Sequence, residues 1–150
     1  MGQGAPSHAS QRGVALGAFR LNRVLGTGAM ARVYRGEHIA SGVPVAVKVM
    51  TATRARAPAY AQAFRNEVEA VARLSHSGIV RVFDFGEVPA GAPEGLDEGA
   101  PFLVMELASE GSLDQVGGPG EWRALKALML ALLDALAHAH ARGVIHRDLK

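Results

Sequence analysis

The stretch LGTGAMARVYRGEHIASGVPVAVKVM, residues 25–50, decides the fold. It opens with Gly26-Thr27-Gly28, continues with a run that mixes β-branched and aromatic residues with polar ones, and turns at Ser41-Gly42 before the apolar run Val43 to Met50. Residues 19–25, which precede it, are apolar at alternating positions. These patterns predict three strands joined by short glycine turns, an antiparallel meander.

Outward from this meander, the periodicity changes from that of strands to that of helices. Apolar residues recur at helical spacing after Pro58, and a second helical stripe of leucines follows Trp122. The predicted elements are a helix from Tyr60 to Leu74, strands from Ile79 to Phe85 and from Phe102 to Leu107, and a helix from Trp122 to Arg142. The segment from Glu87 to Pro101, rich in Gly, Pro and acidic residues, is expected to be a long surface loop without a site. The sequence thus predicts an α+β fold with a five-stranded antiparallel sheet.

The composition excludes several classes of protein. The 150 residues are 49% hydrophobic and 20% charged, with a net charge of +2, so neither a nucleic-acid partner nor a membrane-surface role is expected. The most apolar stretch, residues 124–141, contains Lys126, Asp134 and two histidines, and a membrane span is not expected there. There is no cysteine, which fits a cytoplasmic protein. Residues 1–17 are expected to be a disordered leader.

Gly26 and Gly28 favour a loop that clamps phosphates. Glycine lets the backbone approach phosphate oxygens and donate N–H bonds without a Cβ in the way. A dinucleotide-binding fingerprint requires a helix straight after the glycines and an acid about 20 residues on. Here a strand pattern follows, and Lys48 stands in that neighbourhood. A Walker-type loop fails too, because no Gly-Lys-Ser/Thr occurs.

Lys48 and Glu67 are the candidates for a charged pair. Lys48 lies in the apolar run from Val43 to Met50, where an ammonium needs an anionic partner or a route to water. Glu67 follows Phe64 by three residues and precedes Val71 by four, which places it toward the apolar stripe of its helix. We expect an ion pair between the two, which would position the lysine on nucleotide phosphates. The alternatives are a lysine that reaches water and a glutamate on the helix rim.

The most specific signal is Val144-Ile145-His146-Arg147-Asp148-Leu149-Lys150, directly after the second helix. Asp148 suits a general base or an orienting group for a substrate hydroxyl. Lys150 could stabilise charge that develops on a transferred phosphoryl group. His146 is expected to serve packing rather than chemistry.

In this order, the motifs resemble those of eukaryotic-type Ser/Thr protein kinases, in particular the bacterial members of that family. The resemblance covers Phe19 to Lys150. It implies an N-lobe over about residues 18–107, the start of a C-lobe over 108–150, and transfer of a phosphoryl group from ATP to Ser or Thr residues of protein substrates.

The resemblance also implies a nucleotide site. The lid over ATP would be formed by Leu25, Gly26, Thr27, Gly28, Ala29, Met30, Ala31, Arg32 and Val33. Val33 and Ala46 would sandwich the adenine, Met105 would be the gatekeeper, and the backbones of Glu106 and Ala108 would bond the adenine edge. Lys48, paired with Glu67, would hold the α- and β-phosphates. Asp148 and Lys150 would carry the catalytic loop, and Arg147 resembles kinases that are controlled by phosphorylation of the activation loop. Val71, Val82 and His146 would stack as an internal spine.

Two departures from the family pattern qualify the resemblance. Ala31 stands where the third loop glycine is usual, a mild change. The catalytic-loop Asn and the Asp-Phe-Gly that hold Mg²⁺ in the family are expected only beyond Lys150, so we expect a truncated domain that is inactive by itself. The alternative is a non-catalytic, pseudokinase-like nucleotide-binding or scaffold module.

Overall fold

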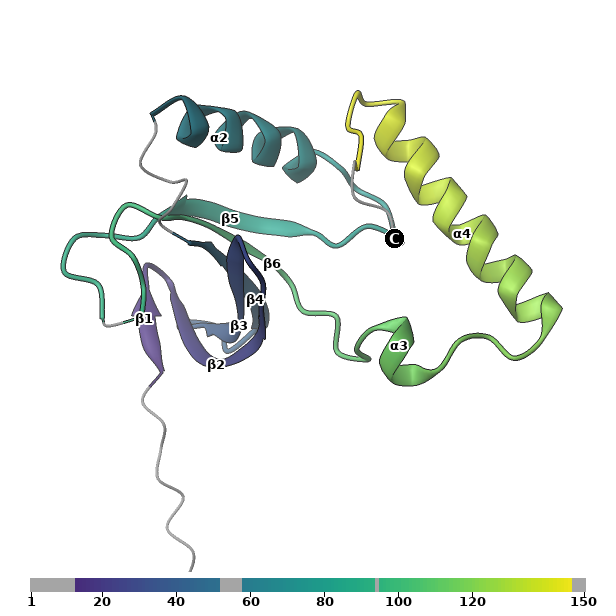
Figure 1. Ribbon diagram of the computed structural model, residues 1–150, viewed down its shortest axis with the longest axis horizontal. Helices are drawn as coiled ribbons and strands as arrows, with labels where there is room; N and C mark the ends of the chain where they lie inside the picture. The colour runs from purple at the N-terminus through teal and green to yellow at the C-terminus, as the bar shows by residue number, and fades with distance from the viewer. Residues whose placement is uncertain (1–12, 52–57, 94, 147–150) are drawn as a thin grey trace, which may run out of the picture.

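The structure, a computed structural model, describes residues 13–51, 58–93 and 95–146. Its centre is a curled, six-stranded antiparallel sheet with the strand order β1-β2-β3-β4-β6-β5 (Figure 1). The strands are β1 (Val14–Leu16), β2 (Phe19–Thr27), β3 (Ala31–His38), β4 (Pro44–Met50), β5 (Val82–Glu87) and β6 (Pro101–Glu106). The helices are α2 (Pro58–Ala72), α3 (Leu113–Val116) and α4 (Trp122–His140). The predicted α+β class and the meander are confirmed.

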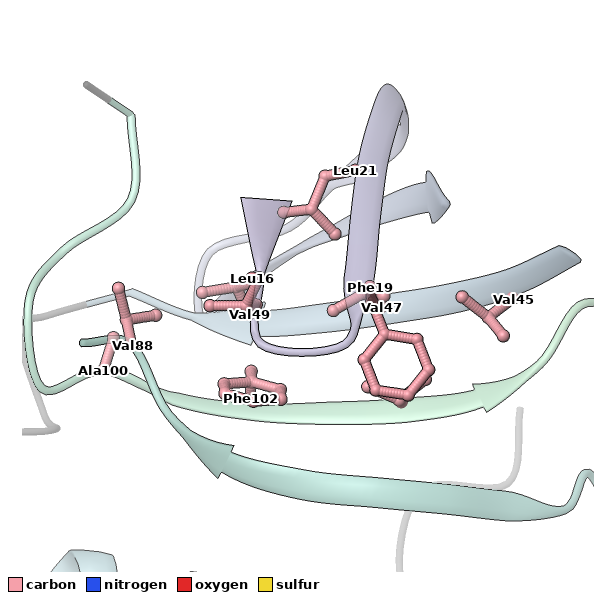
Figure 2. Packing of buried hydrophobic residues seen from close by; sticks show 10 residues of the cluster. Leu16, Phe19, Leu21, Val45, Val47, Val49, Val88, Ala100 and Phe102 are labelled. Carbon is pink, nitrogen blue, oxygen red and sulfur yellow. The ribbon is translucent and has the colours of Figure 1, made fainter. Parts of the chain in front are cut away.

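The hydrophobic core lies on one face of the sheet, inside its curl. Val45, Val47 and Val49 alternate along β4 toward this side, and each is less than 5% exposed. Figure 2 shows them packed against side chains from β1, β2 and β6 and from the segment between β5 and β6. Because neighbouring side chains of a strand point to opposite faces, Ala46 and Lys48 project to the other face of the same strand.

The first strand of the sheet corrects the expected leader of residues 1–17. Val14–Leu16 form β1, which pairs with β2 through Leu16 and Phe19. Gly17, with φ of 57°, occupies the left-handed region that a two-residue hairpin loop requires. Leu16 is 1% exposed, so this short strand belongs to the core. Residues 1–12 of the expected leader lie outside the described residues.

The segment between β5 and β6 also differs from the expected spacer loop. Val88 and Ala100, at its two ends, are almost fully buried, and Ala92 and Leu96 pack against the same core. The Val88 N–H donates to the Ala100 carbonyl at 2.9 Å, which extends the ladder of β5 and β6. The apolar side chains of this segment are therefore part of the hydrophobic core.

The two long helices begin and end close to the expected residues. Pro58 opens α2 at a position where a missing N–H is harmless, and α2 packs against β5 and β6. Within α4 only Ala135 and Ala139 are buried, while much of its apolar stripe stays exposed: Trp122, Leu125, Met129, Leu130, Leu132 and Leu133. None of the described helices combines the length and the apolar character needed to cross a membrane.

Candidate nucleotide site

The strand register brings the expected adenine and phosphate residues to one face of the sheet. Lys48 on β4 is the Cα partner of Val33 on β3 and of Leu103 on β6. Ala46, two residues before Lys48, is the partner of Met105 on β6. Directly opposed residues of antiparallel strands share a face. Val33, Ala46, Lys48, Leu103 and Met105 therefore line one surface, opposite to the core, which we call the cleft face.

The predicted glycine lid is the β2–β3 hairpin at one end of the cleft face. Leu25, Gly26 and Thr27 end β2, Gly28, Ala29 and Met30 form the turn, and Ala31, Arg32 and Val33 begin β3. The Gly28 N–H donates to the Ala31 carbonyl at 2.9 Å, and the Thr51 N–H donates to the Met30 carbonyl at 2.9 Å. The turn is thus closed on itself and tied to the end of β4. Ala31, at the place of the missing third glycine, is buried.

The chain itself gives no reason for glycine at positions 26 and 28. Neither residue adopts a left-handed backbone. A Cβ added at Gly26 would meet no atom within 4 Å, and one at Gly28 would meet only the Ala31 carbonyl oxygen at 3.6 Å. By contrast, a Cβ at Gly36 would lie 2.5 Å from the Arg20 carbonyl oxygen. Open space at Gly26 and Gly28 fits a group from outside the chain that approaches this backbone.

The expected ion pair between Lys48 and Glu67 is not formed. The ion pairs between described residues join Arg20 to Glu37, Arg65 to Glu87 and His76 to Asp134. Lys48 and Glu67 are both exposed. They nevertheless lie in the same part of the fold: Leu103 is the register partner of Lys48, and Leu103 and Glu67 line one cavity.

A different residue of α2 forms an ion pair with the sheet. Arg65 Nη1 donates to Glu87 Oε1 at 2.8 Å, which ties the helix to the end of β5. Both side chains are roughly half exposed, so the pair contributes at most about 1 kcal/mol. The helix packs against β5 and β6 rather than β4, and the carboxylate of Glu67 does not reach the ammonium of Lys48.

Beside Glu67, a cavity of about 430 Å³ separates α2, the sheet and α4. Its lining is mainly apolar and includes Val71, Val82 and His146, the three residues that the kinase resemblance implies as a stacked spine. The structure thus brings these residues, distant in sequence, to one cavity next to the cleft face.

The predicted adenine-binding strand ends at Glu106. Met105 is half-buried on the cleft face, and Ala108 is exposed just beyond β6. The Glu106 N–H donates to the Arg81 carbonyl at 2.8 Å. Because the Glu106 N–H is already used in this bond, only the backbone carbonyl oxygen of Glu106 would be available to accept a hydrogen bond from an adenine edge.

The tripeptide Asp84-Phe85-Gly86 has the residues of the metal-binding kinase motif, which was expected only beyond Lys150. It lies inside β5, where Asp84 is the partner of Val104. Val104 belongs to the core side of the sheet, so Asp84 does not share the cleft face with Lys48. The Asp84 carboxylate accepts a bond from the Phe85 N–H at 2.8 Å. The described residues contain no group of three or more side chains suited to hold a metal ion.

Arg147, Asp148 and Lys150, the predicted catalytic-loop residues, lie outside the described residues. The described chain reaches His146, which follows Gly143 and the end of α4 and lines the cavity. The position of Asp148 relative to the cleft face therefore stays a prediction.

Comparison with known proteins identifies one family over almost the whole chain. The sequence model of the protein kinase domain family matches residues 19–150. The chain is 41% identical to the serine/threonine-protein kinase Pkn1 of Myxococcus xanthus over 92% of its own length and 19% of that protein. It is 35% identical to PknH of Mycobacterium tuberculosis, over 94% of its length and 22% of that protein.

Solved structures agree with the sequence relatives. Two crystal structures of the PknI kinase domain of Mycobacterium tuberculosis superpose with TM-scores of 0.69 and 0.70 at 28% identity. Each comparison covers 93% of this chain and 54% of the PknI chain. The chain thus spans about half of that kinase domain and about a fifth of the curated relatives. The chain belongs to the protein kinase domain family.

Proposed function

We propose that this chain is the nucleotide-binding part of a kinase that phosphorylates Ser and Thr residues of proteins with ATP. The observation that supports this most is the register that gathers Val33, Ala46, Lys48 and Met105 on one face beside the glycine hairpin. A face that offers apolar side chains, a cation and exposed glycine backbone suits an adenine at one end and phosphates at the other.

In this proposal each residue has one task. Val33 and Ala46 hold the adenine between them, and Lys48 donates to the α- and β-phosphates. Asp148 accepts the proton of the attacking Ser or Thr hydroxyl, and Lys150 stabilises charge on the transferred phosphoryl group. Mg²⁺, when bound, would neutralise phosphate charge. The described residues show no ligand set for it, and we place its ligands beyond Lys150.

The unpaired Lys48 and Glu67 imply a movement before catalysis. Kinase chemistry requires this lysine and glutamate to be paired. Glu67 lines the same cavity as Leu103, the register partner of Lys48, so we propose that α2 turns toward β4 when phosphates order Lys48. Breaking the Arg65–Glu87 pair would be a small part of the energy required.

The test uses the chain alone and the chain extended by its own coding sequence. We expect that the 150 residues bind nucleotide weakly and transfer no label from γ-labelled ATP to a Ser/Thr substrate. We expect an extension with an Asn three residues after Lys150 and a later Asp-Phe-Gly to be active. In that longer protein, Asp148→Asn should lower kcat by about 100-fold or more. Transfer by the 150 residues alone, or full activity of the Asp148→Asn protein, would contradict the proposal.

A second candidate is a pseudokinase-like nucleotide-binding or scaffold module, which the missing Lys48–Glu67 pair favours. Such a protein would bind nucleotide, or only a partner protein, without phosphoryl transfer. An extended protein that binds ATP yet shows no transfer would identify it.

For either function we propose a cytoplasmic location, which the absence of cysteine fits.

A further inference from the structure

Two histidines and an aspartate join α4 to the segment that links α2 with β5. His76, in that segment, contacts Asp134 of α4, with His76 Nε2 and Asp134 Oδ2 3.0 Å apart. The ring of His138, one turn further along α4, lies 5.0 Å from the ring of His76. The backbones are also close, since a Cβ at Gly78 would lie 3.2 Å from the Cβ of Ala135. This cluster is therefore a tight joint between two elements far apart in sequence.

The hydrogen bonds of His76 hold its ring in place. The Gly78 N–H donates to His76 Nδ1 at 3.0 Å, so Nδ1 presents a lone pair. With Nδ1 as the acceptor, Nε2 carries the proton and donates to Asp134. Both ring nitrogens of His76 are therefore used within the joint, and the ring presents a fixed surface to His138.

His138 is suited to the neutral form. Its Nε2 is buried and finds no hydrogen-bond partner among the described residues. Burial lowers the pKa of His138 below the ordinary value of 6.5, and the charges of Arg142 and His76 lower it further, whereas Asp134 raises it. A proton on the His138 ring would place a positive charge beside the Arg142 guanidinium and next to the ring of His76.

We propose that His138 makes the contact of α4 with the α2–β5 segment a proton-sensitive joint, which holds α4 on that segment when the His138 ring is neutral and loosens when this ring is protonated. The groups that act on His138 come from both sides of the joint: His76 from the segment, and Asp134 and Arg142 from α4. The cavity that contains Glu67 lies between these same elements. Acid would therefore loosen the wall of that cavity, and this inference does not depend on nucleotide binding.

The sign of the pH dependence follows from the lowered pKa of His138. The docked joint binds fewer protons than a separated one, so its stability rises with pH. The contribution is complete above the ordinary pKa of 6.5 and is lost as pH falls from there through the lower pKa of the docked state.

The test follows single resonances of the isotope-labelled 150-residue chain between about pH 7.5 and about pH 5. We expect the His138 ring to titrate with a midpoint below 6.5. Cross-peaks between Gly78 and Ala135 should weaken over the same range. A His138 midpoint at or above 6.5, or Gly78–Ala135 cross-peaks of unchanged intensity at the acid end, would overturn the proposal.

Variants separate the joint from general acid effects. His138→Phe keeps an aromatic ring without a titrating group, and His138→Gln serves if the Phe variant does not fold. Either should show a smaller loss of unfolding stability than wild type between about pH 7.5 and about pH 5.5. The matched control is His140→Phe, on the same helix at an exposed position, which should keep the wild-type pH dependence. Equal losses in wild type and in the His138 variant would contradict the joint.

Discussion

Lys48 is the residue on which the nucleotide proposal depends most. Its side chain is exposed on the cleft face and has no ion-pair partner among the described residues. We expect Lys48→Met to weaken ATP binding at least about tenfold, because a charge-assisted hydrogen bond contributes about 1.5–3 kcal/mol. The unfolding free energy should change little, since no described contact is lost. Calorimetric titration and urea unfolding measure the two quantities, with Lys126→Met on α4 as the control that retains affinity.

Gly26 and Gly36 give a second comparison between single residues. Gly26→Ala has open space for its Cβ and should leave stability unchanged or raise it by up to about 1 kcal/mol, while it weakens nucleotide binding. Gly36→Ala would place a Cβ 2.5 Å from the Arg20 carbonyl oxygen and should destabilise the fold by about 1–3 kcal/mol. Unfolding curves and ATP affinity of both variants are the measurements. Unchanged affinity in Gly26→Ala would show that no ligand approaches this hairpin.

Strand alternation, a local rule, is enough to place Ala46 and Lys48 on one face of their strand. Val33 joins them through the register of β3 with β4, and its role beside the adenine was expected only from the kinase resemblance. The Lys48–Glu67 contact was not predictable in the same way. It depends on where α2 lies over the sheet, and that position results from the packing of α2 against β5 and β6, which the helical pattern alone does not specify.

Strand β1 lies within the predicted leader of residues 1–17. Its alternation is only three residues long and follows a stretch rich in Gly, Ser and Ala, so composition outweighed the pattern of Val14 and Leu16. The segment from Val88 to Ala100 is a largely exposed loop, as the sequence predicts, but its contribution to the core was not predictable. Its Gly, Pro and acidic residues are typical of exposed loops, while its four buried or half-buried apolar side chains are widely spaced.

The contribution of β1 to stability is directly measurable. Leu16→Ala should lower the unfolding free energy by about 2–5 kcal/mol, because the side chain is 1% exposed within the core. Val43→Ala, at an exposed position before β4, should change it by less than about 0.5 kcal/mol. Urea unfolding of both proteins measures the difference. Similar small effects of both substitutions would mean that β1 is not part of the cooperative fold.

Across the molecule, the sheet has a complete core of its own, whereas α4 does not. Leu125, Leu130, Leu132 and Leu133 of α4 are exposed, and Figure 1 shows the helix lying apart from the sheet. We expect the 150-residue chain to self-associate as its concentration rises, since a contiguous apolar patch favours contact between copies. Sedimentation velocity should show this association, and Leu133→Lys should reduce it. Ile39→Lys, at an isolated exposed site, should leave it unchanged. A chain that stays monomeric at every concentration would contradict this expectation.

The central claim is that one face of the sheet, and not the other, binds ATP. A titration of the ¹⁵N-labelled chain with ATP, followed by amide chemical shifts, tests it most directly, because this method detects weak binding residue by residue. We predict that the shifts cluster at residues 25–33, 46–48 and 105–108, and that β1 and residues 88–100 on the core side remain unaffected. Shifts that are absent, or that gather on the core side, would contradict the nucleotide site.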